Sequence, residues 1–373
     1  MAGCALAFER KSQGVQTAAR DRFQRRADVA GTDDTGLDDE SSAGGTGNNS
    51  AGAKPSGPLA IVIKVVSWLL AIGCFYLVYG RVEAAAARDS LTVLGYLARF
   101  FGDANWLLWL GLMAPYSVFF FLVDAHATWR VVRWFNAPDL RFARMLPIRA
   151  SAYILSLVNE QIGKGAMTLY LLRRHKVPGW QALSSMIFLG LMEIYQLLIF
   201  SAVGVLLYYE LVQQAAVHLP LPTSMLSVFA VATAYFPLHY LYFRGHIGNG
   251  FALRERQILV AFRNAVLTDY VKVLLFKAPN LIGAVIVYTI ALDLFNVSVS
   301  FGQMLAFLPV IFLAAALPLP FHAGALLLWT VLFPDYPEVG AFSLVMHTFF
   351  VSFNALIGLV FLPVANRELI SES

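Results

Sequence analysis

Long blocks of apolar residues alternate with short polar or basic segments along most of this chain. Six of these blocks reach about 20 residues, the length that a helix needs to cross a hydrocarbon core roughly 30 Å thick. We therefore expect six membrane-spanning helices, at about 58–80, 104–124, 180–208, 223–243, 271–295 and 339–363. Composition agrees, because 58% of the 373 residues are hydrophobic and only 13% are charged. The predicted class is an all-α polytopic membrane protein.

Lys and Arg are unevenly distributed among the loops, and this distribution predicts how the chain is oriented. The loop that follows the second block and the loop 244–265 are rich in arginine, so both are expected in the cytoplasm. Loops 209–222, 296–302 and 334–338 contain no Lys or Arg and are expected outside. Segment 81–103 carries arginines although it is predicted outside, and its apolar residues recur at helical spacing. We interpret it as an amphipathic helix at the membrane interface.

Two further apolar stretches are interrupted by polar residues or prolines. Basic residues flank 150–172 on both sides, so both of its ends are expected in the cytoplasm, and each of its arms is too short to cross. We expect a re-entrant hairpin with its tip at Asn159–Gly165, where the glycines supply the turn. The stretch 303–333 lies between loops without Lys or Arg, and predicts a second hairpin that enters from outside, with its tip at Pro318–Gly324.

With these hairpins, the order of elements repeats. Two spans, the inner hairpin and a third span cover 58–208, and two spans, the outer hairpin and a third span cover 223–363. The halves begin on opposite sides of the membrane, which predicts an inverted-topology repeat of the kind found in secondary transporters. Residues 1–57 are expected to be a disordered cytoplasmic tail, and 364–373 a second cytoplasmic tail. The expected location is the cell (inner) membrane.

Polar side chains at membrane depth are costly, so each is a candidate for function. At the first hairpin tip, we expect Lys164, together with Asn159 and Gln161, to meet a lipid phosphate, because a compact ammonium is a competent phosphate partner. The alternative is that Glu160 and Lys164, four residues apart, form an ion pair that only stabilises the hairpin.

The remaining candidates lie on other elements. Glu193 shares a helix face with Gln196, and is expected to neutralise the lysine of the first tip or to bind a coupling proton. His322, at the outer tip, is expected to hydrogen-bond a headgroup or to titrate near neutral pH, and the alternative is that it only caps backbone groups. His347 and Asn354, seven residues apart on the last span, would line the same cavity or form an interhelical hydrogen bond.

Basic residues near the cytoplasmic side are expected to anchor the protein to lipid headgroups. The candidates for headgroup contact are Arg130, Arg133, Arg173 and Arg174. Two lysines of the fifth block, Lys272 and Lys277, are interpreted as side chains that extend to the cytoplasmic interface.

Two sets of short motifs are similar to those of one known family. The first set comprises WR at 129–130, Asn159, LLRRHKVP at 171–178 and LME at 191–193. The second set comprises LPV at 308–310, ALPLP at 316–320 and Gly324. Over about 60–365 the chain resembles the transmembrane region of the lysylphosphatidylglycerol synthase (flippase-like) family.

This resemblance implies a function in moving lipids, or lipid-linked sugars, between leaflets, without the aminoacyl-transferase domain of some members. The chain departs from the family pattern after each hairpin tip, at Gly165-Ala166-Met167 and at Gly324-Ala325-Leu326. We therefore expect a lipid flippase or transporter whose cavity lies between the two hairpins. Its expected partners are anionic or phosphate-bearing membrane lipids, and a homo-oligomer is left open. Nucleic acid, cofactors and metals are not expected.

Two other functions remain open. The chain could be a partner subunit that does not itself transport. It could also be an intramembrane lipid-phosphate transferase, which would need an acid–base set within hydrogen-bond reach. The candidates for that set, Glu160, Glu193 and His322, lie on different elements, so an enzyme is not the expected outcome.

Overall fold

The computed structural model describes residues 58–370, apart from 159, 216–220, 249–251 and 318. The expected N-terminal tail lies outside the described residues. The chain divides into two units, 1–66 and 67–373. In the first unit the described residues from 58 onward are helical, and everything that follows concerns the second unit.

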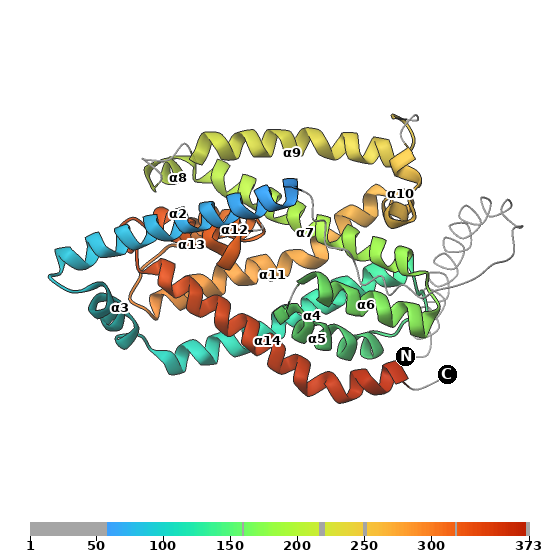
Figure 1. The fold of residues 1–373 in the computed structure, drawn as a ribbon, viewed down its shortest axis with the longest axis horizontal. Coiled ribbons are helices and arrows are strands. Elements are labelled where there is room, and N and C mark those ends of the chain that lie inside the picture. The colour runs from blue at the N-terminus through green and yellow to red at the C-terminus, as the bar shows by residue number, and fades with distance from the viewer. Residues whose placement is uncertain (1–57, 159, 216–220, 249–251, 318, 371–373) are drawn as a thin grey trace, which may run out of the picture. The chain divides into compact units, whose positions relative to one another are not determined.

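Six helices are long and apolar enough to cross a membrane, as the sequence predicts (Figure 1). They are α2 (Pro58–Arg88), α4 (Trp106–Phe135), α7 (Gly179–Leu207), α9 (Leu221–Phe243), α11 (Leu267–Asp293) and α14 (Val339–Ile370). The described part of the chain contains only helices and their connections. The protein is therefore an all-α, multi-pass membrane protein.

Three of these helices continue past the predicted blocks. Helix α2 runs on to Arg88 through the stretch VEAAAAR, because consecutive alanines favour a helix even where apolar blocks end. Helix α4 continues to Phe135, so Arg130 and Arg133 lie on a helix and not in the expected loop. Helix α14 continues to Ile370, across most of the expected C-terminal tail.

The shorter helices occupy the connections and the interrupted stretches. They are α3 (Val93–Gly102), α5 (Phe142–Val158), α6 (Glu160–His175), α8 (Tyr209–Ala215), α10 (Val260–Asn264), α12 (Phe301–Ala315) and α13 (Ala323–Leu332). Helix α3 lies in the segment predicted to be an amphipathic helix. Its Tyr96 hydroxyl donates a hydrogen bond of 2.7 Å to the buried carboxylate of Glu338. Burial is the main cause that raises the pKa of Glu338.

Each interrupted stretch forms a pair of short helices that pack together, α5 with α6 and α12 with α13. In the second pair the helices are separated by a break that includes a 3₁₀ turn at Pro320–His322, within the predicted tip. In the first pair the predicted turn at the glycines is wrong, because Gly163 and Gly165 lie inside α6. A glycine weakens a helix interior by about 1 kcal/mol and does not by itself end the helix. Entry of either pair into a membrane stays a prediction.

Packing repeats between the two halves of the chain. Helix α4 packs on α11, α5 packs on α14, and α12 packs on α7. We match α4, α5 and α7 of the first half with α11, α12 and α14 of the second half, in that order. The contact of α5 with α14 then corresponds to the contact of α12 with α7. The counterparts run in opposite directions, as α4 and α11 show in Figure 1, and the two short pairs lie at opposite ends of the long helices. These contacts agree with the inverted repeat predicted from the order of elements.

Each of the two exchanged contacts contains a glycine at which the helix backbones approach closely. A Cβ on Gly204 of α7 would lie 2.8 Å from Ala306 Cα of α12. A Cβ on Gly358 of α14 would lie 2.7 Å from both the carbonyl oxygen of Ala150 and Cγ1 of Ile154, on α5. In both places the absence of a side chain lets two helix backbones approach closely.

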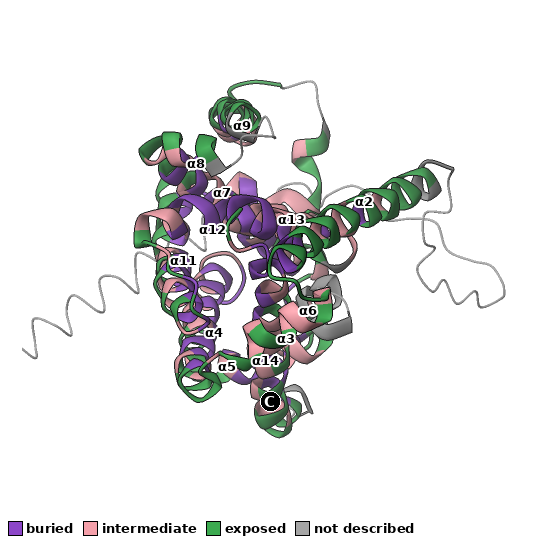
Figure 2. Cartoon of the chain, turned by 90° about the vertical axis from the view of Figure 1, so that its left-hand side faces the viewer, coloured by how far each residue is buried: buried purple, intermediate pink, exposed green. Residues whose placement is uncertain are grey.

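Helices α2 and α9, which begin the two halves, are the least buried of the six long helices (Figure 2). Only 6% and 11% of their most apolar windows are buried, against 39% for both α7 and α11. Their exposed side chains are mainly apolar, such as Leu69, Leu70 and Val231. In a multi-pass membrane protein such faces contact lipid, so the core consists of α4, α7, α11, α14 and the short pairs.

We predict that Gly204→Ala and Gly358→Ala each lower the thermal unfolding temperature in detergent. The added methyl groups must push helix backbones apart, and overpacking of this kind costs about 1–3 kcal/mol. Gly111→Ala is the matched control, because a Cβ at Gly111 would meet nothing within 4 Å. Unchanged stability of both interface variants would contradict the close packing.

We also predict the labelling pattern of single cysteines in a background that lacks Cys4 and Cys74. If the short helix pairs are re-entrant, cysteines at Asp139 and Lys176, which flank α5–α6, react with impermeant reagents from the same side. Cysteines at Ser298 and Asp335, which flank α12–α13, react from the opposite side. If the two flanks of either pair were labelled from different sides, that pair would be an ordinary crossing.

Candidate functional site

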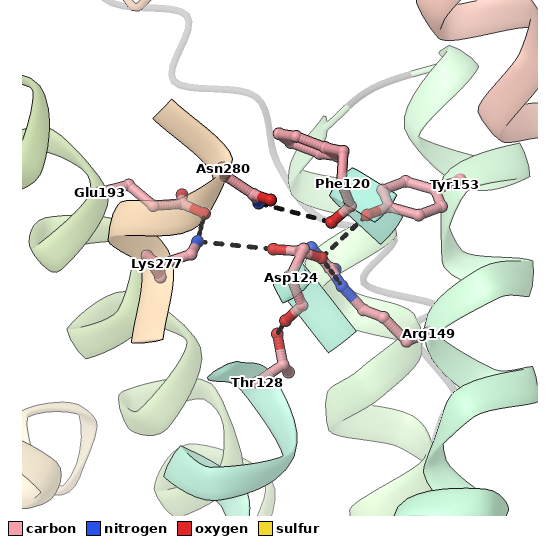
Figure 3. Close-up of polar contacts among 8 residues, drawn as sticks. All are labelled: Phe120, Asp124, Thr128, Arg149, Tyr153, Glu193, Lys277 and Asn280. Atoms are coloured by element: carbon pink, nitrogen blue, oxygen red, sulfur yellow. Dashed lines mark hydrogen bonds and ion pairs between the residues drawn. The ribbon is translucent and has the colours of Figure 1, made fainter. Parts of the chain in front are cut away.

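The side chain of Asp124, on α4, lies at the centre of a buried polar cluster (Figure 3). Its Oδ2 accepts hydrogen bonds from Arg149 Nε at 2.7 Å and from the Tyr153 hydroxyl at 2.8 Å, both on α5. Its Oδ1 lies 3.4 Å from Lys277 Nζ on α11. One carboxylate therefore joins three helices.

Lys277 joins a second carboxylate to this cluster, because its ammonium also donates a hydrogen bond to Glu193 on α7. The side chains of Asp124 and Lys277 are 4% and 5% exposed, whereas that of Glu193 is 39% exposed. Two negative and two positive groups cancel each other. We call Asp124, Arg149, Lys277 and Glu193 the charge cluster. Such neutralisation is required where charges are removed from water.

Helix geometry positions these groups on facing sides of α4 and α11. Lys277 and Asn280 are three residues apart and share one face of α11. Phe120 and Asp124 are one turn apart on α4. The Asn280 side-chain amide donates a hydrogen bond of 3.4 Å to the Phe120 carbonyl, one turn before the ion pair with Asp124. The two helices are therefore held together by neighbouring polar contacts.

The charge cluster borders a cavity of about 610 Å³, here called the central cavity. Its polar lining comes from Glu193, Gln196, Lys277 and Asn280, and the rest is mostly apolar or aromatic. Gln196 Nε2 and Asn280 Oδ1 are buried and have no hydrogen-bond partner among the described residues. An unpaired donor and an unpaired acceptor in one cavity are sites where a polar ligand could bind.

A second cavity of about 290 Å³, here called the histidine cavity, adjoins the first. The two cavities share the aromatic lining residues Tyr116, Phe120 and Phe312. His322 and His347 line the histidine cavity, and the centres of their rings are 4.5 Å apart.

A third hollow runs between α7 and α9 and has a volume of about 480 Å³. It is lined almost entirely by apolar and aromatic side chains, and we call it the apolar groove. Leu191 and Ile194 line both this groove and the central cavity. The central cavity thus adjoins the histidine cavity through one set of residues and the apolar groove through another.

Several predicted site residues fall in these cavities. Glu193 and Gln196 both line the central cavity, as their shared helix face predicts. Glu193 pairs with Lys277, so the interpretation of Lys277 as a side chain that extends to the interface is wrong. Lys272 is exposed, with its ammonium 5.9 Å from the Trp134 ring centre. His322 makes no side-chain hydrogen bond as the N-cap of α13, so the capping alternative is wrong.

Other predicted residues are not brought to the cavities. Asn354 is buried, does not line either cavity with His347, and its Oδ1 has no partner among the described residues. Arg130 and Arg133 lie near the Trp129 ring, with guanidinium carbons 5.6 Å and 5.0 Å from its centre. Arg173 is exposed and Arg174 is half-buried on the last turn of α6.

The first hairpin tip cannot be compared with its predicted role. Asn159 lies outside the described residues, as do the side chains of Glu160, Gln161 and Lys164. Their expected contact with a phosphate, and the expected Glu160–Lys164 pair, stay predictions.

Sequence reasoning missed Asp124, Arg149 and Tyr153. The signal for Asp124 is present, because it is an acid that follows the apolar run SVFFFLV and precedes more helix. The predicted block ended at residue 124, which placed this acid at the interface, where an ionised group needs no partner. The structure continues α4 to Phe135, and Asp124 then lies well inside a helix, where it needs partners.

Comparisons of this chain with models of known protein families, with curated proteins and with solved structures found no match. Among the described residues, no three His, Cys, Asp or Glu side chains come together as a metal site would require.

We predict that Asp124→Asn destabilises the protein more than Glu193→Gln. Among the described residues, loss of the Asp124 charge leaves Arg149 without a carboxylate partner and Lys277 with one partner, and breaking a buried ion pair costs about 3–5 kcal/mol. Glu193 is partly exposed, so its loss leaves Lys277 paired with Asp124 at a smaller cost. Thermal unfolding in detergent measures both, with the exposed Glu210→Gln as control. The reverse order would contradict a central role for Asp124.

Proposed function

We propose that this protein is a membrane lipid transporter, or flippase, in which the lipid headgroup occupies the central cavity and an acyl chain lies in the apolar groove. The observation that carries this proposal is the continuity of the two hollows. Leu191 and Ile194 border a cavity that contains two charged and two amide side chains on one side, and a groove lined by apolar and aromatic groups on the other. A lipid likewise has a polar headgroup joined to apolar acyl chains.

The lining of the central cavity indicates which headgroup atoms would bind there. Asp124 and Arg149 do not line this cavity, and Lys277 is almost fully buried, so the most accessible charge is the carboxylate of Glu193. A carboxylate accepts hydrogen bonds and favours hydroxyl or ammonium groups. The unpaired Asn280 oxygen adds an acceptor and the Gln196 amide adds a donor. We infer that the cavity binds the hydroxyl- or amine-bearing part of a headgroup.

The arrangement of the two halves supports transport rather than static binding. Halves that run in opposite directions around a shared cavity are typical of secondary transporters, in which one half moves against the other. The motif resemblance to the flippase-like family points to the same function. We also propose that both termini lie in the cytoplasm and that the protein resides in a cell (inner) membrane.

The test is translocation of lipids by purified protein in liposomes. Fluorescent lipids with different headgroups are incorporated, and the fraction accessible to an impermeant quencher is followed with time. We expect faster exchange between leaflets than in empty vesicles for at least one headgroup. Rates equal to those of empty vesicles for every headgroup would contradict the proposal and favour a partner subunit that does not transport.

We further predict that Gln196→Leu slows this exchange by about tenfold, which corresponds to about 1.4 kcal/mol of lost binding to the headgroup. The substitution removes the unpaired amide donor and keeps a similar volume, without touching the charge cluster. Gln213→Leu, at an exposed position on α8, is the matched control and should keep the original rate. Equal rates for both variants would exclude a contact between Gln196 and the cargo.

A further inference from the structure

His322 and His347 face each other from separate elements at the wall of the histidine cavity. His322 precedes α13, His347 lies on α14, and their ring centres are 4.5 Å apart. Neither imidazole makes a hydrogen bond to any described residue, so their nitrogens are available to a ligand in the cavity.

The backbone at His322 is held in an unfavourable conformation. Its φ of 52° and ψ of 36° are left-handed, a region that residues other than glycine rarely adopt. The imidazole does not compensate for this conformation by capping α13. Strained backbone of this kind is concentrated at ligand-binding positions. It places the His322 ring against His347, immediately before the first residue of α13.

The remaining lining of the histidine cavity supplies no negative charge. The other titratable side chains that line it are the phenols of Tyr116 on α4 and Tyr288 on α11. Its described lining on α12, α13 and α14 contains no Asp, Glu, Lys or Arg. A protonated imidazole here would therefore have no carboxylate partner in the described lining, and a bound anion could neutralise it.

We propose that His322 and His347 form a phosphate subsite, distinct from the charge cluster, that binds a phosphoryl group together with a proton. Imidazole changes its charge near neutral pH, so it can hold an anion when protonated and release it when neutral. Beside it, the central cavity presents the carboxylate of Glu193. One headgroup would then occupy both adjoining cavities, with its phosphate at the histidines and its hydroxyl or amine at Glu193.

The phosphate could come from a lipid headgroup or from free phosphate. If the bound phosphate belongs to a lipid, this inference rests on the proposed function. If it is free phosphate, the inference does not depend on lipid transport. Both sources share the same chemistry at the imidazoles, and the experiment separates them.

The experiment uses the purified full chain in detergent, labelled with nitrogen-15 at its seven histidines. Imidazole resonances are recorded during titration with inorganic phosphate, and in a second arm with short-chain phosphatidic acid or the matching diacylglycerol. Sulfate is titrated in parallel, because phosphate itself gains a proton in this pH range whereas sulfate keeps its charge. The titrations are repeated at about pH 8 and about pH 6, on either side of the ordinary imidazole pKa.

We expect the apparent Kd for sulfate to fall by about tenfold from pH 8 to pH 6, since binding takes up a proton. His322→Gln and His347→Gln should each weaken binding and reduce its pH dependence. His246→Gln, at an exposed position in the loop after α9, should behave like the unaltered protein. Perturbation by inorganic phosphate without lipid would identify free phosphate as a ligand. Perturbation by phosphatidic acid alone, without an effect of diacylglycerol, would identify the lipid phosphate.

Equal affinity at both pH values in the unaltered protein would overturn the proposal, and this result does not depend on whether any variant folds. Anion binding that persists unchanged in both histidine variants would also overturn it. A protein that binds the anion at these histidines but moves no lipid in liposomes would keep the phosphate subsite and contradict the proposed transport. The two ideas can therefore fail separately.

Discussion

Mutual neutralisation of two carboxylates and two cations determines how the core helices of this protein can pack. Asp124 and Lys277 are almost fully buried, and each contacts two groups of opposite charge. Because the four charges come from α4, α5, α7 and α11, a shift of any one of these helices would leave a charge without its partner. Apolar packing alone gives little preference for one helix register in lipid, where hydrocarbon surrounds every face. The charge cluster supplies that preference, and it also provides the polar wall of the central cavity.

Features that depend on neighbouring residues could be predicted from the sequence, whereas contacts between distant residues could not. The six spans follow from block length, and the break between α12 and α13 follows from the prolines in that stretch, since both are local properties of the chain. The pairing of Glu193 could not be predicted, because its partner Lys277 lies 84 positions away, and the base expected to pair with it was Lys164 at the first hairpin tip. The turn predicted at Gly163 and Gly165 was wrong because it was inferred from these two residues alone. The helix α6 continues through both of them.

The two halves are similar in their helix–helix contacts and not in their amino-acid sequences. The two halves show no evident sequence similarity, yet Gly204 and Gly358 occupy corresponding crossings, α7 with α12 and α14 with α5. Each crossing needs a residue without a side chain at one position, while the surrounding positions need only be apolar. One position in about 30 is too little for a repeat to be recognised from sequence. It becomes visible only when the packing partners of each helix are known.

The exchanged contacts have a consequence for how the chain is completed during synthesis. Helix α5 lies in the first half, but it packs against α14, the last helix of the described chain, which is made after the rest of both halves. Asp124 and Arg149 can pair with each other as soon as α4 and α5 are made, but Asp124 lacks the ammonium of Lys277 until α11 is made, and α5 lacks its packing partner until α14 is made. The first half therefore stays incompletely packed until α14 has been made. A chain that ended before α14 would contain every residue of the first half and still leave the α14-facing side of α5 without its packing partner.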